Sequence, residues 1–205
     1  MSEQDAAVAL VPDRACGSCH ACCVALLIDT AAFQKHSGVA CHHLDSDRRC
    51  GIYASRYEAC RAFHCGYRQL PWLPETMRPD QAGVLVLPLM TRPDDAPDGK
   101  LLPSVVFVIL DEASLDSEAL TTSVIAAVRE EVLIVLSVRG PPGTTSSRID
   151  ISEALLLPAM MRNRRGIQRI LREAYAHAKA VERPAVVFRN GGERRPRGGG
   201  DEQAE

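Results

Sequence analysis

The sequence is poor in aromatic residues, carries little net charge, and has no cysteine after Cys65. Aromatic residues make up 4% of the 205 residues, which argues against a surface that stacks on nucleic-acid bases. The net charge of -2 creates no general attraction to nucleic acid or to an anionic membrane. We therefore expect neither a nucleic-acid partner nor a membrane partner; the expected partner is a metal ion.

Long apolar runs and targeting signals are also missing. The apolar runs at 101–110 and 132–138 are far shorter than the roughly 20 residues that a membrane-spanning helix needs. The first 15 residues carry three acids and no basic residue before Arg14, which is unlike a secretory signal. These absences predict a cytoplasmic protein. In the cytoplasm, clustered cysteines more often bind metal or take part in catalysis than form disulfides.

Cysteine is abundant within one short stretch. All eight cysteines lie in the first third of the chain: Cys16, Cys19, Cys22, Cys23, Cys41, Cys50, Cys60 and Cys65. The first four form a Cys-x2-Cys-x2-Cys-Cys motif. Thiolates from short loops with this spacing are typical ligands of zinc and of iron–sulfur clusters. We predict that all eight are metal ligands and that the cofactor is zinc or an iron–sulfur cluster (iron).

The spacing leaves the grouping of the eight thiols open. If residues 16–23 are helical, Cys16, Cys19 and Cys23 share one stripe, because positions i, i+3 and i+7 are neighbours on a helix. Adjacent side chains then diverge, so Cys22 and Cys23 would serve different ions or different edges of one cluster. Four plus four cysteines allow two four-thiolate sites, or one four-cysteine cluster and a zinc ion.

Basic residues and histidines are interspersed among the cysteines. Arginine guanidinium groups could lie beside the sulfurs and offset thiolate charge, although an arginine on a solvated surface is the commoner arrangement. A histidine could complete a site if a thiol is diverted, and five are near enough: His20, His36, His42, His43 and His64. A catalytic Cys–His pair is disfavoured, because reactive cysteines are usually singled out.

Composition divides the chain into five segments. Residues 1–13 are expected to be a flexible N-terminus. Residues 14–68 form a cysteine-cluster metal-binding module that has too few apolar side chains to hold its shape without bound metal. Residues 69–80 are the predicted linker, 81–189 the α/β lobe, and 190–205 a disordered tail. The predicted fold class is α+β, with a small metal-stapled cysteine module followed by a small mixed α/β lobe.

Hydrophobic patterns in the lobe predict the order strand, strand, helix, strand, helix. Predicted strands cover residues 83–90, 104–110, 132–138 and 186–188. Predicted helices cover 117–131, 151–161 and an amphipathic stretch from residue 165. The second strand should be buried on both faces, because its apolar run is nearly continuous. Ser152 is expected to be a weak cap of its helix.

Several short sequence motifs resemble those of a known protein family. Cys16-Gly-Ser-Cys-His-Ala-Cys-Cys23, Cys41-His-His-Leu44, Cys50-Gly-Ile-Tyr53 and Cys60-Arg-Ala-Phe-His-Cys65 resemble the YkgJ-type CxxCxxCC family of zinc- or iron-chelating bacterial proteins. The similarity covers residues 14–90. His42 and Tyr57 stand where that family often has proline, but neither change removes a thiol. The resemblance implies a metal or iron–sulfur site with a poorly defined activity.

The leading hypothesis is a metal-binding protein that holds zinc or an iron–sulfur cluster through clustered cysteine thiolates. The alternative is a cluster-dependent redox or transferase enzyme whose substrate is bound by the C-terminal lobe. One branch of the resembled family includes flagellin lysine methylases, but no nucleotide or methyl-donor motif occurs in this sequence. A zinc-stapled interaction module and a metal-free thiol redox sensor are further alternatives.

Overall fold

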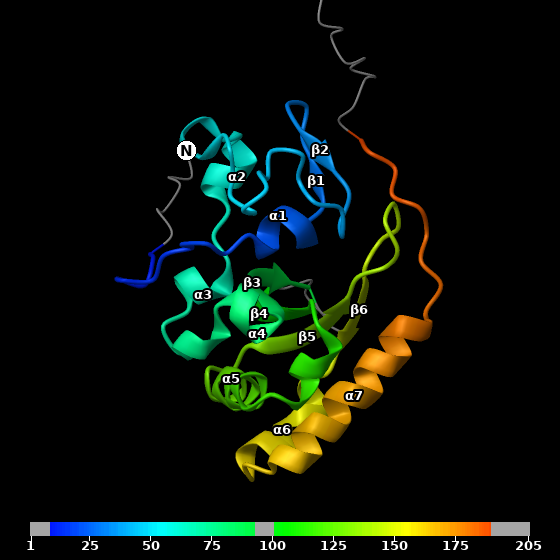
Figure 1. Cartoon of the computed structure of the whole chain (residues 1–205). Helices are drawn as coiled ribbons and strands as arrows, with labels where there is room; N and C mark the ends of the chain where they lie inside the picture. Colours follow the sequence, from blue (N-terminus) through cyan, green and yellow to red (C-terminus); the bar gives the residue numbers. More distant parts are fainter. Residues whose placement is uncertain (1–8, 93–100, 190–205) are drawn as a thin grey trace, which may run out of the picture.

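A computed structural model of the chain describes residues 9–92 and 101–189. The fold is mixed α/β, in agreement with the predicted α+β class, and its main four-stranded sheet lies between two unlike layers (Figure 1). One layer consists of long helices and the other of the cysteine-containing segments. The predicted flexible N-terminus is described only from residue 9, and the predicted disordered tail at 190–205 lies outside the described residues.

The main sheet has the strand order β3-β4-β5-β6. Its strands are β3 (Val84–Thr91), β4 (Leu102–Ile109), β5 (Leu133–Val138) and β6 (Ser147–Asp150). β4 and β5 are parallel, while β3 and β6 are antiparallel to their neighbours. A parallel pair needs a crossover connection, which here contains a helix. The sequence patterns predicted the first three strands but not β6, which is short and mostly polar.

β4 is the central strand, and it is buried on both faces as predicted. Every residue from Ser104 to Ile109 is buried. Since successive side chains of a strand point to opposite faces, Val105 and Phe107 pack on the helix side, and Val106 packs on the cysteine side. The sheet therefore has two separate hydrophobic clusters, one on each face.

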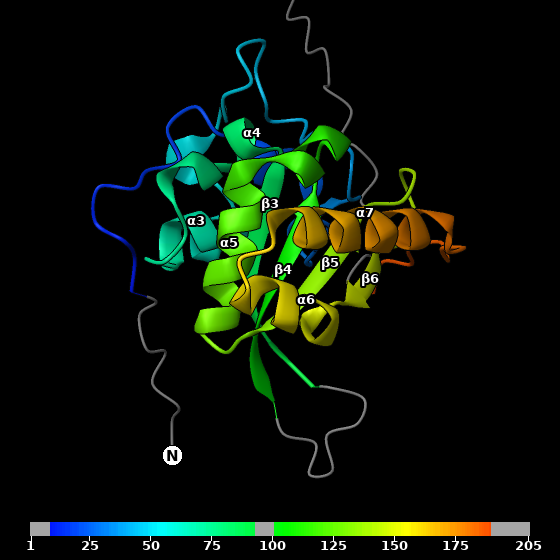
Figure 2. The ribbon, with the colours of Figure 1, turned by 90° about the horizontal axis from the view of Figure 1, so that it is seen from below.

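The helix layer contains α5 (Glu118–Arg129), α6 (Ser152–Met160) and α7 (Arg164–Ala180), which cover one face of the sheet (Figure 2). α5 begins where the Ser117 hydroxyl accepts a hydrogen bond from the Leu120 N–H, at 3.1 Å. α7 is amphipathic as predicted, and its buried residues recur at helical spacing: Ile167, Leu171, Ala174 and Ala178. These residues join the sheet in one core.

Two local predictions in the lobe are wrong. Ser152 does not cap α6; its hydroxyl accepts the Ile134 N–H of β5 at 2.8 Å, and Ile151 is the N-cap residue. Residues 186–188 do not form a strand. Only Ala185 makes an isolated bridge, with Thr144, because this segment runs along the 140–145 turn and not along the edge of the sheet.

The segment at 69–80 is packed into the core, although it was expected to be a linker. It contains a 3-10 turn, η2 (Glu75–Met77), and is flanked by α3 (Gly66–Gln69) and α4 (Pro79–Ala82). Leu73 and Met77 are 1% and 0% exposed and belong to the helix-side cluster. This segment therefore connects the cysteine region to the lobe through buried side chains.

The arginines at the start of α7 lie on a solvated surface. Arg164 pairs with Glu118, Arg169 with Glu173, and Arg172 with Asp116, and all six side chains are more than half exposed. Exposed pairs of this kind contribute little stability. Among the described residues, the helices are all too short or too polar to cross a membrane.

Candidate functional site

The Cys-x2-Cys-x2-Cys-Cys motif is a turn followed by a short helix. Helix α1 (Ala21–Ala25) begins only after His20, and Gly17 has a φ of 55°, which interrupts any helix before it. The Cys19 N–H closes the turn by donating to the Cys16 carbonyl at 2.8 Å. The helical stripe that would place Cys16, Cys19 and Cys23 together does not form, because residues 16–19 are not helical.

The other four cysteines come from loops and from the ends of short helices. Cys41 and Cys50 lie in a loop that is closed by a bridge between Leu44 and Cys50. Cys60 lies on α2 (Glu58–Ala62), and Cys65 is the N-cap residue of α3. The 3-10 turn η1 (Tyr53–Ser55) precedes α2, and the two do not form one continuous helix because the backbone between them is extended.

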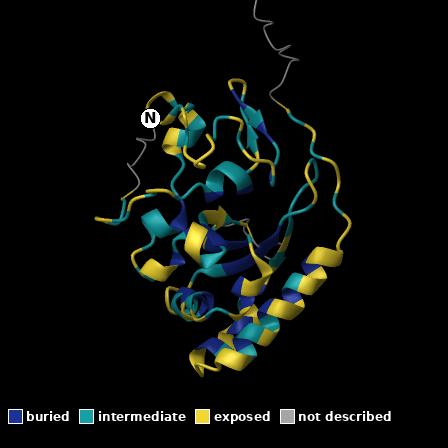
Figure 3. Cartoon of the chain, viewed as in Figure 1, coloured by how far each residue is buried: buried dark blue, intermediate teal, exposed yellow. Residues whose placement is uncertain are grey.

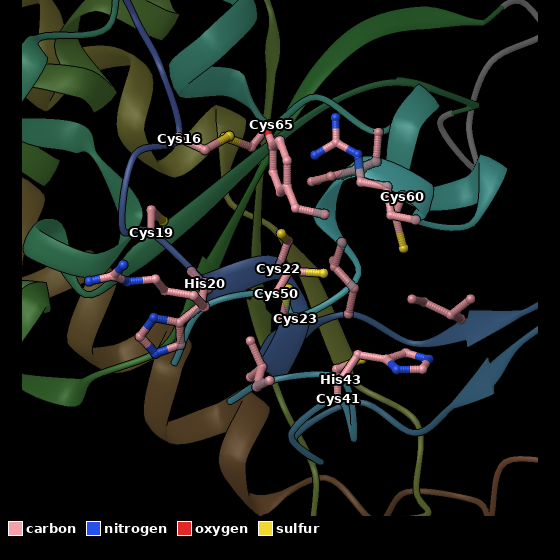
Figure 4. Close-up of a pocket in the computed structure, with 18 of the residues that line it drawn as sticks. Cys16, Cys19, His20, Cys22, Cys23, Cys41, His43, Cys50, Cys60 and Cys65 are labelled. Atoms are coloured by element: carbon pink, nitrogen blue, oxygen red, sulfur yellow. The ribbon is translucent and has the colours of Figure 1, made fainter. Parts of the chain in front are cut away.

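All eight cysteines line one cavity of about 390 Å³ (Figure 4). All eight are free thiols, seven of them partly exposed and Cys65 buried. Three of the candidate histidines line the same cavity (His20, His43 and His64), whereas His36 and His42 do not. Apart from Pro79 and Leu85, the lining comes entirely from residues 16–65. The fold therefore gathers every predicted ligand around one space.

The thiols share this space without converging on a single point. In residues 9–92 and 101–189, no group of three or more His, Cys, Asp or Glu side chains is placed so that it could hold one metal ion. Four sulfurs on one zinc ion lie about 3.8 Å apart, given tetrahedral bonds of about 2.3 Å. The cysteine side chains are thus farther apart, or aimed differently, than a single ion requires.

Comparisons with protein families, with curated proteins and with solved structures find no match to this chain. The resemblance to the YkgJ-type family therefore stays a prediction that rests on the cysteine-containing motifs. What the protein does must be inferred from the chemistry of the cavity.

The adjacent thiols of Cys22 and Cys23 interact with each other at the centre of the cavity. Hydrogen bonding from the Cys22 thiol lowers the pKa of Cys23 to about 7, assisted by the positive charges of Lys35 and Arg56. The same hydrogen bond, together with burial, raises the pKa of Cys22. Both side chains line the cavity, so neither thiol is excluded from it by the divergence expected of adjacent residues.

Three other thiols have a raised pKa, unlike Cys23, because burial is the dominant effect on them. It raises the pKa of Cys19 to about 11, and it also raises the pKa of Cys60 and of Cys65. Backbone N–H groups at the start of α3 partly oppose this effect at Cys65. These thiols are protonated at neutral pH without metal, so metal binding must release protons.

Lys35 is a functional candidate that sequence reasoning did not single out. It is only 6% exposed, and its ammonium group donates to the carbonyls of Val24, His36 and Val39 at 3.2, 3.0 and 2.9 Å. Burial lowers its pKa, while the neighbouring thiols of Cys41 and Cys23 act in the opposite direction. A single lysine in a polar loop has no sequence signature, since only the fold reveals that it is buried.

Proposed function

We propose that this protein binds metal, and that its cysteine thiolates hold zinc or an iron–sulfur cluster. The observation that carries this proposal is that eight free thiols, spread over 50 positions of the chain, line one cavity. Thiolates are soft ligands that suit zinc and iron–sulfur clusters and do not suit magnesium or calcium. The proposed ligands are Cys16, Cys19, Cys22, Cys23, Cys41, Cys50, Cys60 and Cys65.

Fixed positive charge at the cavity supports this assignment. Lys35 and Arg56 both belong to its lining, and both lower the pKa of Cys23. Several thiolates in a half-buried space repel one another strongly, since charge interactions strengthen as water is excluded. Cations held beside the sulfurs reduce that repulsion and so favour the deprotonated ligands that a metal requires.

The spacing of the thiols favours an iron–sulfur cluster over a single zinc ion. In a [4Fe–4S] cluster, each cysteine binds a different iron atom, so the sulfurs are farther apart than those around one ion. Binding a single zinc ion would require the side chains to rotate inward, because no three of them are now placed around one ion in the described chain. A zinc ion would tie the loops together, and a cluster would in addition carry an electron.

The enzyme alternative receives no support from the cavity lining. Beyond the cysteine region, only Pro79 and Leu85 reach the cavity. A substrate bound by the described lobe would therefore have few lobe side chains beside the thiols. We also propose that the protein works in the cytoplasm, because so many free thiols require a reducing compartment.

The proposal is tested by purifying the full chain without oxygen and measuring its zinc, iron and acid-labile sulfide. We expect bound metal, and a brown colour if the metal is an iron–sulfur cluster. Cys60→Ser should lower the metal content, whereas His42→Gln should not, because His42 is exposed and does not line the cavity. A metal-free native chain with eight thiols that react freely with a thiol reagent would overturn the proposal.

A further inference from the structure

We infer that the eight cysteines form two separate four-thiol centres. The first set is Cys16, Cys19, Cys22 and Cys65, and the second set is Cys23, Cys41, Cys50 and Cys60. This inference rests on the proposed function, because it assigns the ligands within the same cavity. The division does not follow the order of the chain: the last cysteine joins the first three, and Cys23 separates from its own motif.

The first set is assembled by contacts between the N-terminal arm and the segment that begins at α3. The Val11 N–H donates to the Arg68 carbonyl at 2.8 Å. The Arg14 guanidinium donates to three carbonyls of the same segment at 3.0, 3.0 and 2.6 Å, those of Tyr67, Leu70 and Leu73. These bonds hold the residues just before Cys16 against those just after Cys65.

The turn that carries Cys19 is attached to the same part of the fold. The Arg78 guanidinium donates to the Ser18 hydroxyl at 3.0 Å and forms an ion pair with Asp80 at 2.6 Å. These contacts hold the turn of Cys19 against the segment that follows Cys65, although 46 positions separate the two cysteines in the sequence.

The second set is assembled around the loop after α1. The Cys41 N–H donates to the Cys23 carbonyl at 3.0 Å, and the bridge at Leu44 brings Cys50 to the same loop. The rings of Phe33 and Tyr57 stack at 4.6 Å, and Tyr57 immediately precedes the helix that carries Cys60. This stack joins the loop to α2, the helix that carries Cys60.

The positions of the side chains agree with this division. Figure 4 shows Cys16, Cys19 and Cys65 on one side of the cavity and Cys41 and Cys60 on the other, with Cys22, Cys23 and Cys50 between them. Cys22 and Cys23 are neighbours on α1 and therefore form the contact between the two sets.

The two centres differ in their surrounding charge. The Lys35 ammonium group donates to the carbonyls of Val24 and Val39, directly after Cys23 and two residues before Cys41, and Arg56 also lines the cavity. Beside the turn of Cys19, the positive charge of Arg78 is already paired with Asp80. The second centre is therefore better suited to hold negative charge, and it should release its metal later than the first when a chelator is added.

Double substitutions that remove the same number of thiols test the division. Cys16→Ser with Cys65→Ser removes two ligands from one set, as does Cys41→Ser with Cys60→Ser, whereas Cys16→Ser with Cys41→Ser removes one from each set. The full chain is stripped of metal and titrated with Cd²⁺ without oxygen, while thiolate-to-metal absorption is recorded. We expect each within-set pair to keep one complete centre, with half of the wild-type signal. The across-set pair should keep none that is complete.

A second test leaves every thiol in place. Arg14→Met should weaken the first centre, because it frees the arm before Cys16, and Lys35→Met should weaken the second. The opposite effects of the two variants are measured by the order in which the two centres release Cd²⁺ to a chelator. Circular dichroism of the helices checks that each variant is folded. The division would be overturned if all three double variants lost the same share of the thiolate-to-Cd²⁺ absorption. It would also be overturned if Arg14→Met and Lys35→Met changed the early and the late release of Cd²⁺ equally. Either result would leave metal binding intact. A wild-type chain that takes up no Cd²⁺ would overturn the proposed function itself.

Discussion

The two faces of the main sheet are covered by layers of different construction. On one face, α5 and α7 have 12 and 17 residues and pack a continuous apolar cluster against the strands. On the other face, α1 and α2 have only five residues each, and the apolar cluster contains six buried residues. Figure 3 shows the same contrast, with buried residues concentrated in the sheet and the inner sides of the helices.

This difference indicates what each layer needs in order to fold. Helices of four or five residues are unstable alone, because the cost of nucleation is shared by too few hydrogen bonds. The helix layer compensates through buried apolar area, which the cysteine layer largely lacks. We therefore expect the cysteine layer to depend on another interaction, which the proposed binding of metal by its thiols would supply.

The largest expected effect is the response to metal removal. We expect chelation to open the cysteine layer while the helix layer stays folded, since the two rely on different interactions. Hydrogen exchange should show loss of protection at the Cys41 N–H, which is bonded to the Cys23 carbonyl, and retention at the Leu136 N–H of β5. If both amides keep their protection after complete chelation, the cysteine layer does not depend on metal.

A matched pair of substitutions on β4 sharpens the comparison. Val105 and Val106 are each 1% exposed, but Val105 belongs to the helix-side cluster and Val106 to the cysteine-side cluster. In the metal-loaded chain, each valine-to-alanine change should cost about 2–3 kcal/mol, from two lost methyl groups and a cavity. In the metal-free chain, only Val105→Ala should keep that cost, because the layer over Val106 is already open. Denaturant unfolding of both forms measures the difference, and equal costs in the metal-free chain would contradict it.

A smaller effect is expected at Gly66 of α3, which packs against Val86 of the helix-side cluster. A Cβ atom at this position would lie 2.7 Å from Cγ1 and 2.9 Å from Cβ of Val86. Gly66→Ala should therefore destabilise the chain by about 1–3 kcal/mol through overpacking. It should also disturb Cys65, the preceding residue. Combining Gly66→Ala with Val86→Ala should recover part of the stability lost to the clash, and a double-mutant cycle measures this recovery. Strictly additive costs would mean that the two side chains do not compete for space.

The smallest effect concerns the helix layer alone. The Asn163 side chain accepts a hydrogen bond from the Gly166 N–H at 3.0 Å and caps α7. Asn163→Ala should cost about 1 kcal/mol, and Asn163→Asp should retain most of the stability, because aspartate caps equally well. Neither change should alter the metal content, since the cap is on the opposite side of the sheet. A loss of metal in Asn163→Ala would show that the two layers are more strongly coupled than proposed.

Local patterns in the sequence were sufficient to predict much of the lobe. The continuous apolar run of β4 and the periodic apolar residues of α7 are features that one element carries by itself. β6 was not predicted because Ile149 is its only apolar residue, and it is a strand only because β5 offers an unpaired edge. Leu73 was assigned to a linker because the prolines around it are typical of a connecting segment. The burial of its side chain in the core depends on the fold.

The sequence by itself determined that eight thiols are concentrated in one stretch, since their number and spacing need no fold to be recognised. The tertiary structure alone decided which thiols are neighbours. Cys65 lies near Cys16 because Arg14 bonds to carbonyls of the segment after Cys65, and Cys60 lies near Cys41 because Phe33 stacks on Tyr57. Such contacts join residues that are distant along the chain, so no local pattern of residues records them.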